Sequence, residues 1–228
     1  MKMIKVAVFD DEGTGPSKYE LHRCLDSFDE ISYRLVSAEE IRSGLLDEID
    51  VLVHPGGGGS KQGRCLGLSG RIKVRRFVSQ GGCFLGICAG AYLASSDYVW
   101  SLHLIDARVH DRAHWNRGSG EVELQMTPVG QEILDTPDSS VQIHYGQGPL
   151  YMPANTPGVP EYELLAEYVT AVAKNGASEE NMIGTSAIAA APYGSGRVFC
   201  FGPHPEMTEG LDGFVQRAIH WLSKFQKS

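Results

Sequence analysis

The sequence predicts an α/β protein built on a parallel sheet that helices cover on both faces. Over the first ninety residues, short apolar runs typical of buried strands alternate with segments of helical periodicity, and the connections between them are short. The chain also has 27 glycines among 228 residues, well above the usual share of about 7%. This excess indicates that tight backbone turns matter to the structure.

The parallel strands of this sheet are expected in the first half of the chain. Mainly apolar runs predict them at residues 4–9, 31–36, 49–53 and 83–87. Parallel strands need long connections, and each gap here is long enough to hold a helix.

Three helices are expected in these gaps. The first follows Pro16, and its buried face should hold Leu21, Cys24, Leu25 and Phe28. The second begins at a capping box formed by Ser37 and Glu40. The third ends at Gly81 and Gly82, and its helical spacing groups Leu68, Ile72, Arg75 and Val78 on one face.

The second half of the chain predicts antiparallel hairpins. Residues 121–126 alternate with period two, and apolar runs follow at 141–144, 164–172 and 183–191. A hairpin is expected from 187–192 and 198–202, joined by 193–197. A final helix should bury Leu211, Phe214, Val215, Ala218, Ile219 and Leu222. With no linker or repeat, we expect a single domain over residues 1–228.

Charge and cysteine content narrow the classes of function. Lys and Arg total 20 against 28 Asp and Glu, a net charge of −8, which disfavours nucleic-acid and anionic-membrane binding. The basic run at 71–76 is expected to be the solvated face of a helix. Five cysteines without a C-x-x-C pair predict neither a disulfide framework nor a zinc ribbon. With no signal peptide or membrane span visible, we expect a cytoplasmic protein without a cofactor.

Cys88 occupies the most informative segment. A buried strand breaks at Gly86, and the G-x-C-x-G run through Gly90 leads into a helix of small residues. This is the nucleophile-elbow pattern with cysteine in place of serine, and the N–H groups that open the helix would stabilise a thiolate. The alternative is a buried structural cysteine, but the flanking glycines favour the nucleophile.

A base for this nucleophile is expected at His204. The strand at 198–202 leads to it, and Glu206 could hold the imidazole through its second nitrogen. Because the carboxyl ends of parallel strands meet at one edge of a sheet, Cys88 and His204 could meet there. Taken alone, His204 could equally be a surface histidine.

The glycine run at 56–59 is a third candidate. It does not fit the phosphate-binding pattern G-x-x-x-x-G-K-[ST], because Lys61 does not follow a glycine. We interpret Gly56 and Gly57 as backbone donors of an oxyanion hole, together with the N–H of Ala89. The alternative is a flexible loop.

The runs at 55–57, 86–90 and 204–206 together resemble the class I glutamine amidotransferase-like superfamily, whose members carry a Cys-His-Glu triad in this order. Within it, segments 71–82, 85–92 and 144–151 resemble the N-terminal domain of biotin–protein ligases and their free-standing bacterial relatives. The resemblance implies a flavodoxin-like three-layer sandwich with Cys88, His204 and Glu206 as the triad.

The chain departs from the superfamily in places that bear on function. Its glutaminases have Gln four residues after the nucleophile, where this chain has Tyr92, which argues against glutamine as substrate. The biotinyl-adenylate loop G-R-G-R-x-G is missing, so the chain is not expected to ligate biotin by itself. It has no P-loop either, so a partner protein or synthetase subunit would have to receive any ammonia.

A histidine cluster follows in the middle of the chain. His110 and His114, with His103 nearby, could be a metal pair on a helix, but the surrounding arginines and the lack of a nearby cysteine argue against a metal site. Their segment, with Trp115 and Asn116, is better interpreted as a loop over the active site.

The acids Asp10, Asp11 and Glu12 end the first strand. They are expected to cap helices, although in glyoxalase-type members of the superfamily an acid near this place hydrogen-bonds the cysteine.

We therefore expect a cysteine-dependent hydrolase or amido/acyl transferase acting on the C–N amide bond of a small molecule or peptide. The predicted substrate-binding residues are Tyr92, Trp115, Tyr145 and Gly146. A non-catalytic regulatory or binding module related to biotin–protein ligase stays open as an alternative. A redox or glyoxalase-like role for Cys88, with Asp11 or Glu12, is the third option. The sequence does not indicate the oligomeric state.

Overall fold

The strands of the described residues form one eleven-stranded sheet. The structure is a computed structural model that describes residues 3–157 and 159–224. The main strand order is β2-β1-β3-β4-β11-β10-β9-β6-β7, and β5 and β8 pair beside this path. The strands are β1 (Ile4–Phe9), β2 (Ile31–Val36), β3 (Val51–His54), β4 (Cys83–Ile87), β5 (Ala107–Val109), β6 (Ser119–Met126), β7 (Ser140–Gly146), β8 (Tyr151–Pro153), β9 (Glu163–Tyr168), β10 (Ser186–Tyr193) and β11 (Gly196–Phe201).

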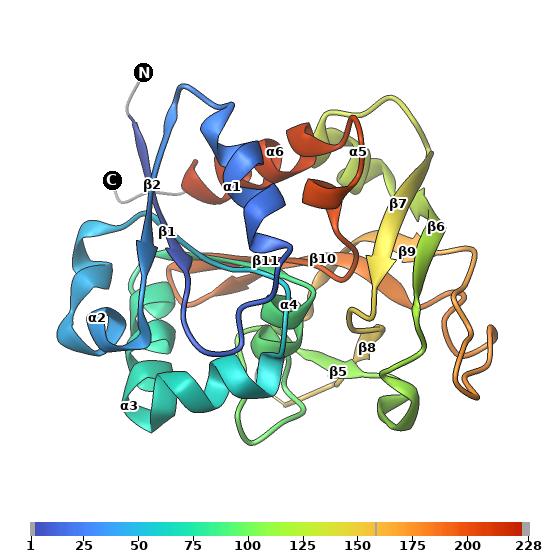
Figure 1. Cartoon of the computed structure of the whole chain (residues 1–228), viewed down its shortest axis with the longest axis horizontal. Helices are drawn as coiled ribbons and strands as arrows, with labels where there is room; N and C mark the ends of the chain where they lie inside the picture. The colour runs from blue at the N-terminus through green and yellow to red at the C-terminus, as the bar shows by residue number, and fades with distance from the viewer. Residues whose placement is uncertain (1–2, 158, 225–228) are drawn as a thin grey trace.

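Helices cover both faces of the sheet (Figure 1). On one face α1, α5 and α6 pack on one hydrophobic cluster, and on the other α2, α3 and α4 pack on a second. This is the predicted flavodoxin-like three-layer sandwich. The helices are α1 (Lys18–Asp26), α2 (Ala38–Ser43), α3 (Gly59–Ser79), α4 (Ala89–Ala94), α5 (Pro128–Leu134) and α6 (Asp212–Ser223), and short 3-10 helices form at Leu45–Glu48, Arg112–His114 and Pro205–Met207.

The first half of the sheet is parallel, as predicted. β1 pairs in parallel with β2 and β3, and β4 pairs in parallel with β3 and β11. Three of the four strands have the predicted bounds. β3 begins at Val51 instead of Ile49, because Ile49 still closes the preceding 3-10 turn by donating its N–H to Leu46 O.

The capping box that opens α2 is confirmed. The Ser37 hydroxyl accepts from Glu40 N, and the Glu40 carboxylate accepts from Ser37 N at 2.9 Å. The predicted face of α1 is correct for Leu21, Cys24 and Leu25, but the helix ends at Asp26. Phe28 therefore packs on the core from the loop that follows.

Of the four residues predicted to share a face of α3, only Val78 is buried. Leu68 and Ile72 are 64% and 49% exposed, whereas the residues that face the core are Leu66, Gly70, Val74 and Val78. A Cβ at Gly70 would lie 3.2 Å from Cβ of Leu66, and Gly70 itself is buried, so this face is partly built on a glycine. Counting apolar side chains at helical spacing therefore identifies the wrong face of this helix.

The second half of the sheet is antiparallel. β10 and β11 form the predicted hairpin, with Tyr193 opposite Gly196 at its end. The alternation predicted for β6 is present, and Val122, Leu124 and Met126 are buried. The apolar run at 164–172 is longer than the strand it forms, since β9 ends at Tyr168.

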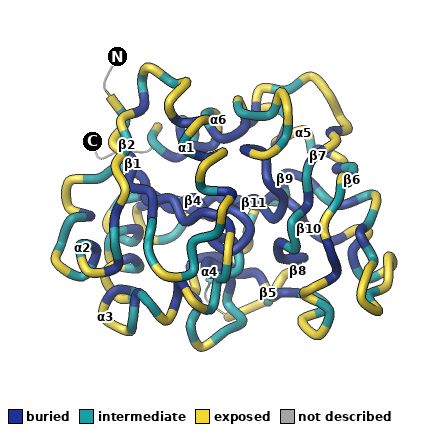
Figure 2. Tube along the Cα trace, in the orientation of Figure 1, coloured by how far each residue is buried: buried dark blue, intermediate teal, exposed yellow. Residues whose placement is uncertain are grey.

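The sheet gathers several strand ends at one edge. β11, β9 and β7 share the direction of β4, because β10 and β6 each run antiparallel to their neighbours. The carboxyl ends of β3, β4, β11 and β7 therefore lie at the same edge as the start of β6. The middle strands β4 and β11 are almost entirely buried (Figure 2), which makes them a rigid base for this edge. Within the described ranges, no helix is both long and apolar enough to cross a membrane.

Candidate active site

Cys88 lies in the turn between β4 and α4. Its backbone has φ 50 and ψ −97, a region that residues other than glycine rarely adopt. Two close approaches make the turn possible. A Cβ on Gly86 would lie 2.6 Å from the carbonyl carbon of Gly90, and one on Gly90 would lie 2.0 Å from His54 O. The strained elbow predicted from the G-x-C-x-G run is therefore present.

His204 and Glu206 follow β11 and form a buried pair. Nδ1 of His204 lies 2.7 Å from Oε1 of Glu206, and Glu206 is fully buried. Burial by itself would lower the pKa of His204, but the Glu206 carboxylate and the Cys88 sulfur hold that pKa well above its usual value. The Cys88 sulfur therefore lies near enough to the imidazole to raise its pKa. The structure thus brings the three residues of the predicted triad together.

Two glycines border the His204 imidazole. A Cβ on Gly56 would lie 2.7 Å from Cε1 of His204, and one on Gly146 would lie 2.9 Å from its Nε2. The Cys88 thiol donates to the Gly146 carbonyl at 3.4 Å. Both glycines are therefore needed for close packing around the imidazole, and Gly146 also touches the sulfur.

The loop that carries Gly56 and Gly57 is fixed by its neighbours. Gly15 N donates to Gly56 O and Gly58 N donates to Gly13 O, both at 2.8 Å. Gly57 has φ 138, and a Cβ there would lie 2.2 Å from Gly13 O. Among the described residues, the N–H of Gly57 makes no backbone hydrogen bond in this loop. The loop is thus held in place, which speaks against the flexible-loop alternative.

Ala89 is the first residue of α4, so its N–H has no partner within the helix. It directly follows Cys88, where a donor to a reacting carbonyl would be needed.

His54 and Gln62 support the loop that carries Gly56 and Gly57. The sequence did not predict this role for either residue. His54 is fully buried between the rings of Phe9 and Phe84. Its Nδ1 lies 3.0 Å from Oε1 of Gln62, and the Gln62 amide donates to Pro55 O at 3.0 Å. Burial lowers the pKa of His54 to about 4, so the ring is neutral at pH 7.

The predicted substrate-binding residues occupy different environments. Tyr92 is half-buried, and burial raises its pKa well above the usual value, with Cys88 among the charges that act on it. Tyr145 is fully buried and donates its hydroxyl to Gly148 O at 2.8 Å. It therefore supports the 146–148 loop from the core, and its burial does not fit the substrate contact predicted for it.

Trp115 is 57% exposed. Its neighbour Asn116 accepts a 2.8 Å hydrogen bond from the Gln147 amide. The loop around Trp115 and the loop that carries Gly146 are therefore joined next to Gly146, and a position of the first loop over the site stays a prediction.

The suggested metal pair does not form on a helix. Only a short 3-10 turn, Arg112–His114, occurs there. His114 Nδ1 lies 2.6 Å from Asp111 Oδ1, and the buried guanidinium of Arg117 donates to the same carboxylate. Among the residues that the structure describes, no group of three or more metal-binding side chains occurs.

Of the acids after β1, Asp11 has the helix-capping role that was expected, since it accepts from Ala38 N at 3.0 Å at the start of α2. Asp10 instead forms an ion pair with Lys18 at 2.5 Å. The cysteine on which Asp11 and Glu12 act is Cys65. This placement gives no support to their suggested partnership with Cys88.

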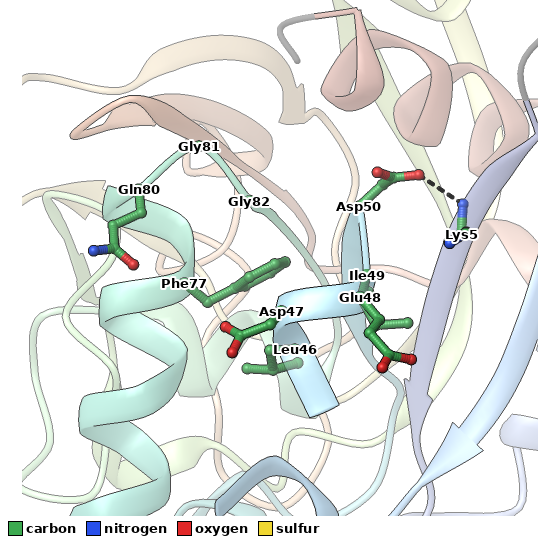
Figure 3. A pocket seen from close by; sticks show the side chains of 10 residues that line it. All are labelled: Lys5, Leu46, Asp47, Glu48, Ile49, Asp50, Phe77, Gln80, Gly81 and Gly82. Carbon is green, nitrogen blue, oxygen red and sulfur yellow. Dashed lines mark hydrogen bonds between the residues drawn. The ribbon is translucent and has the colours of Figure 1, made fainter. Parts of the chain in front are cut away.

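A cavity of about 580 Å³ lies at the opposite edge of the sheet (Figure 3). It is lined by Lys5 near the start of β1, Asp50 before β3 and Gly82 before β4, with Phe77 and Asp47 on its walls. These are the amino ends of strands whose carboxyl ends carry Cys88 and Gly56. The cavity is therefore separate from the candidate active site.

Comparison with known proteins finds a protein family that matches part of this chain. Residues 4–114 match the family described as "Biotin-protein ligase, N terminal". The resemblance found in the sequence is confirmed over this segment, which contains Cys88 but neither His204 nor Glu206. No curated protein matches the chain.

Solved structures share the fold over nearly the whole chain. They include a protein from Thermoplasma acidophilum described as part of a GMP synthase, with 16% identity, 99% of this chain and 96% of that chain covered, and a TM-score of 0.66. A glutamine amidotransferase has 20% identity, covers 96% of this chain and 98% of its own, and has a TM-score of 0.66. PurLQS from Thermotoga maritima has 17% identity, coverage of 97% and 100%, and a TM-score of 0.64. The fold is thus glutamine amidotransferase-like.

Proposed function

We propose that this protein is a cysteine-dependent hydrolase or amido/acyl transferase that acts on a C–N amide bond. The strained Cys88 turn carries the proposal, because it faces an imidazole whose other nitrogen lies 2.7 Å from the buried Glu206 carboxylate. A thiol, a base in contact with it and a group that orients the base are the parts of an activated sulfur nucleophile. Residues 1–228 would form a single catalytic domain.

The proposed reaction begins with proton transfer from the Cys88 thiol to Nε2 of His204. The thiolate attacks the carbonyl carbon, and the N–H groups of Ala89 and of Gly56 or Gly57 bind the developing oxyanion. The C–N bond breaks as the imidazolium gives its proton to the leaving amine, and a thioester remains on Cys88. Glu206 stabilises the charged imidazole, consistent with the raised pKa of His204.

Tyr92 argues that the substrate is an amide other than glutamine. It stands four residues after Cys88, where the glutaminases that this chain resembles have Gln, and its side chain is half-buried, with Cys88 among the groups that raise its pKa. A phenol cannot offer the paired donor and acceptor of a carboxamide. We therefore propose a small-molecule or peptide amide.

A second protein is a further part of the proposal. One structural neighbour is described as a subunit of GMP synthase, and this chain has no P-loop with which to activate an acceptor. A transferase would thus pass ammonia or the acyl group to a partner protein or synthetase subunit, whereas a hydrolase would need none.

A non-catalytic binding module is the second candidate. The observation in its favour is that Cys88 is only 5% exposed and that its thiol donates to Gly146 O. A resting site this closed could hold a ligand without turning it over.

Alkylation by iodoacetamide distinguishes the two candidates. Burial raises the pKa of Cys24 and Cys200 to about 12 and that of Cys83 to about 11, so these thiols should stay unreactive at pH 7. Cys88 should react first, as followed by peptide mass spectrometry across pH, because the thiolate is the reactive form. His204→Ala should slow the reaction.

Turnover gives the complementary measurement. Cys88→Ala should abolish hydrolysis of p-nitrophenyl acetate while the circular dichroism spectrum stays unchanged. Undiminished hydrolysis in Cys88→Ala, or a Cys88 that is alkylated no faster than the half-buried Cys65, would overturn the enzyme proposal in favour of the binding module.

A further inference from the structure

His144 forms a second imidazole–carboxylate pair beside the candidate triad. It lies in β7, directly opposite Glu121 in β6, and its Nδ1 lies 3.1 Å from Oε1 of Glu121. Nδ1 of His204 lies 2.7 Å from Oε1 of Glu206 in the same way. In both pairs the glutamate carboxylate contacts Nδ1 of the ring, and Nε2 stays available for another contact.

Both Nε2 atoms face the same glycine. A Cβ on Gly146 would lie 2.9 Å from Nε2 of His204 and 4.0 Å from Nε2 of His144. The ring centroids of the two histidines are 6.1 Å apart. Since the Gly146 carbonyl also accepts from the Cys88 thiol, at 3.4 Å, a sulfur and two imidazoles surround one residue.

The backbone fixes the distance between the two histidines. His204 N donates to His144 O at 2.8 Å. The Thr208 hydroxyl donates to His204 O at 2.8 Å and accepts from His144 N at 3.0 Å. The backbone of His144 is therefore held beside the candidate site by two hydrogen bonds, and Thr208 connects it to His204 by a third.

The two rings differ in their access to water. The His144 side chain is 26% exposed, whereas that of His204 is 6% exposed and enclosed between Gly56 and Gly146. The groups that face His144 are the Glu121 carboxylate, the His204 ring and the Thr208 hydroxyl. Of the two imidazoles, His144 is thus the one that water can approach from solvent.

We infer that His144 is a second general base, which activates the water that hydrolyses the Cys88 thioester. This inference rests on the proposed function. As Nε2 of His144 takes a proton from water, the oxygen forms a bond to the thioester carbonyl carbon. The C–S bond then breaks, its electron pair returns to sulfur as thiolate, and the acid leaves. His144 releases its proton to solvent.

The test separates formation of the acyl-enzyme from its hydrolysis. Cys88 is acetylated with p-nitrophenyl acetate, the excess reagent is removed, and loss of the acetyl group is followed by intact-mass spectrometry. His144→Gln should leave the rate of acetylation unchanged and slow deacetylation by about 100-fold, the usual contribution of a general base. Glu121→Gln should slow deacetylation less, since it only orients the ring.

His220→Gln is the matched control. His220 in α6 pairs with Glu30 at 2.8 Å, so the same substitution removes a similar pair at the opposite edge of the sheet. Both rates should be those of the unsubstituted protein.

Three results would count against the inference. Deacetylation that is unchanged in His144→Gln, or acetylation that falls as much as deacetylation, overturns the role of His144 and leaves the triad intact. If Cys88 of the unsubstituted protein is not acetylated at all, the proposed function fails and the role of His144 fails with it.

Discussion

His54 illustrates how a residue without access to solvent can support a reactive site. Its imidazole lies between two phenyl rings, and its Nδ1 is held by the Gln62 side chain, which in turn donates to Pro55 O next to Gly56. Nε2 of His54 has no hydrogen-bond partner among the described residues. A second proton, on Nε2, would therefore be buried without a partner, and burial favours the neutral form of the ring.

This burial predicts an acid-sensitive contribution to stability. The pKa of His54 is about 4 in the folded protein against an ordinary 6.5, so the unfolded chain takes up the proton first as pH falls. The contribution of His54 to the free energy of unfolding is fully present above pH 6.5. The free energy of unfolding falls by about 3 kcal/mol as the pH drops to about 4. Urea unfolding of His54→Phe, which keeps the aromatic stack, should show a shallower decline over this range than the unsubstituted protein. Parallel declines would contradict the assignment.

At the scale of elements, the turn between β4 and α4 depends on glycines where backbones meet. Gly90→Ala would place a methyl carbon 2.0 Å from His54 O, a contact that only backbone movement can relieve. We expect a loss of about 1–3 kcal/mol or more in the free energy of unfolding, together with slower alkylation of Cys88.

Gly213→Ala is the matched control for this substitution. Gly213 lies in the first turn of α6, and a Cβ there meets nothing within 4 Å. Replacing a helical glycine with alanine should therefore stabilise the protein by about 0.5–1 kcal/mol. Equal effects of the two substitutions in urea unfolding would show that the close approach at Gly90 is unimportant.

The sequence predicts those elements whose signal is local. The capping box at Ser37 and the elbow at Cys88 depend on neighbouring residues, and both are present. The role inferred for His144 depends on the pairing of β6 with β7 and on the strand order that brings β7 to the edge where β11 ends. A histidine two residues before a glycine in an alternating strand gives one hint, because positions two apart lie on the same face of the strand. Its partner Glu121 is 23 residues earlier, and no local pattern connects them.

At the scale of the whole molecule, both halves of the chain contribute to the candidate site. Cys88 comes from the parallel half and from the segment that matches the biotin–protein ligase family, residues 4–114. His144, His204 and Glu206 come from the antiparallel half, and the central pairing of β4 with β11 aligns the two halves. The candidate site therefore exists only when the second half is folded onto the first.

The two edges of the sheet should act independently. Gly82 and Cys88 lie at opposite ends of β4, about 20 Å apart at the rise of an extended strand, so the cavity at the amino edge shares no side chain with the candidate site. Asp47→Asn changes the charge of that cavity at an exposed position. Because distant sites without shared partners behave additively, the rates of Cys88 alkylation and of acetyl-Cys88 hydrolysis should stay within about twofold of the unsubstituted protein. A change of about tenfold in either rate, about 1.4 kcal/mol of coupling, would show instead that the rigid central strands transmit an effect from one edge to the other.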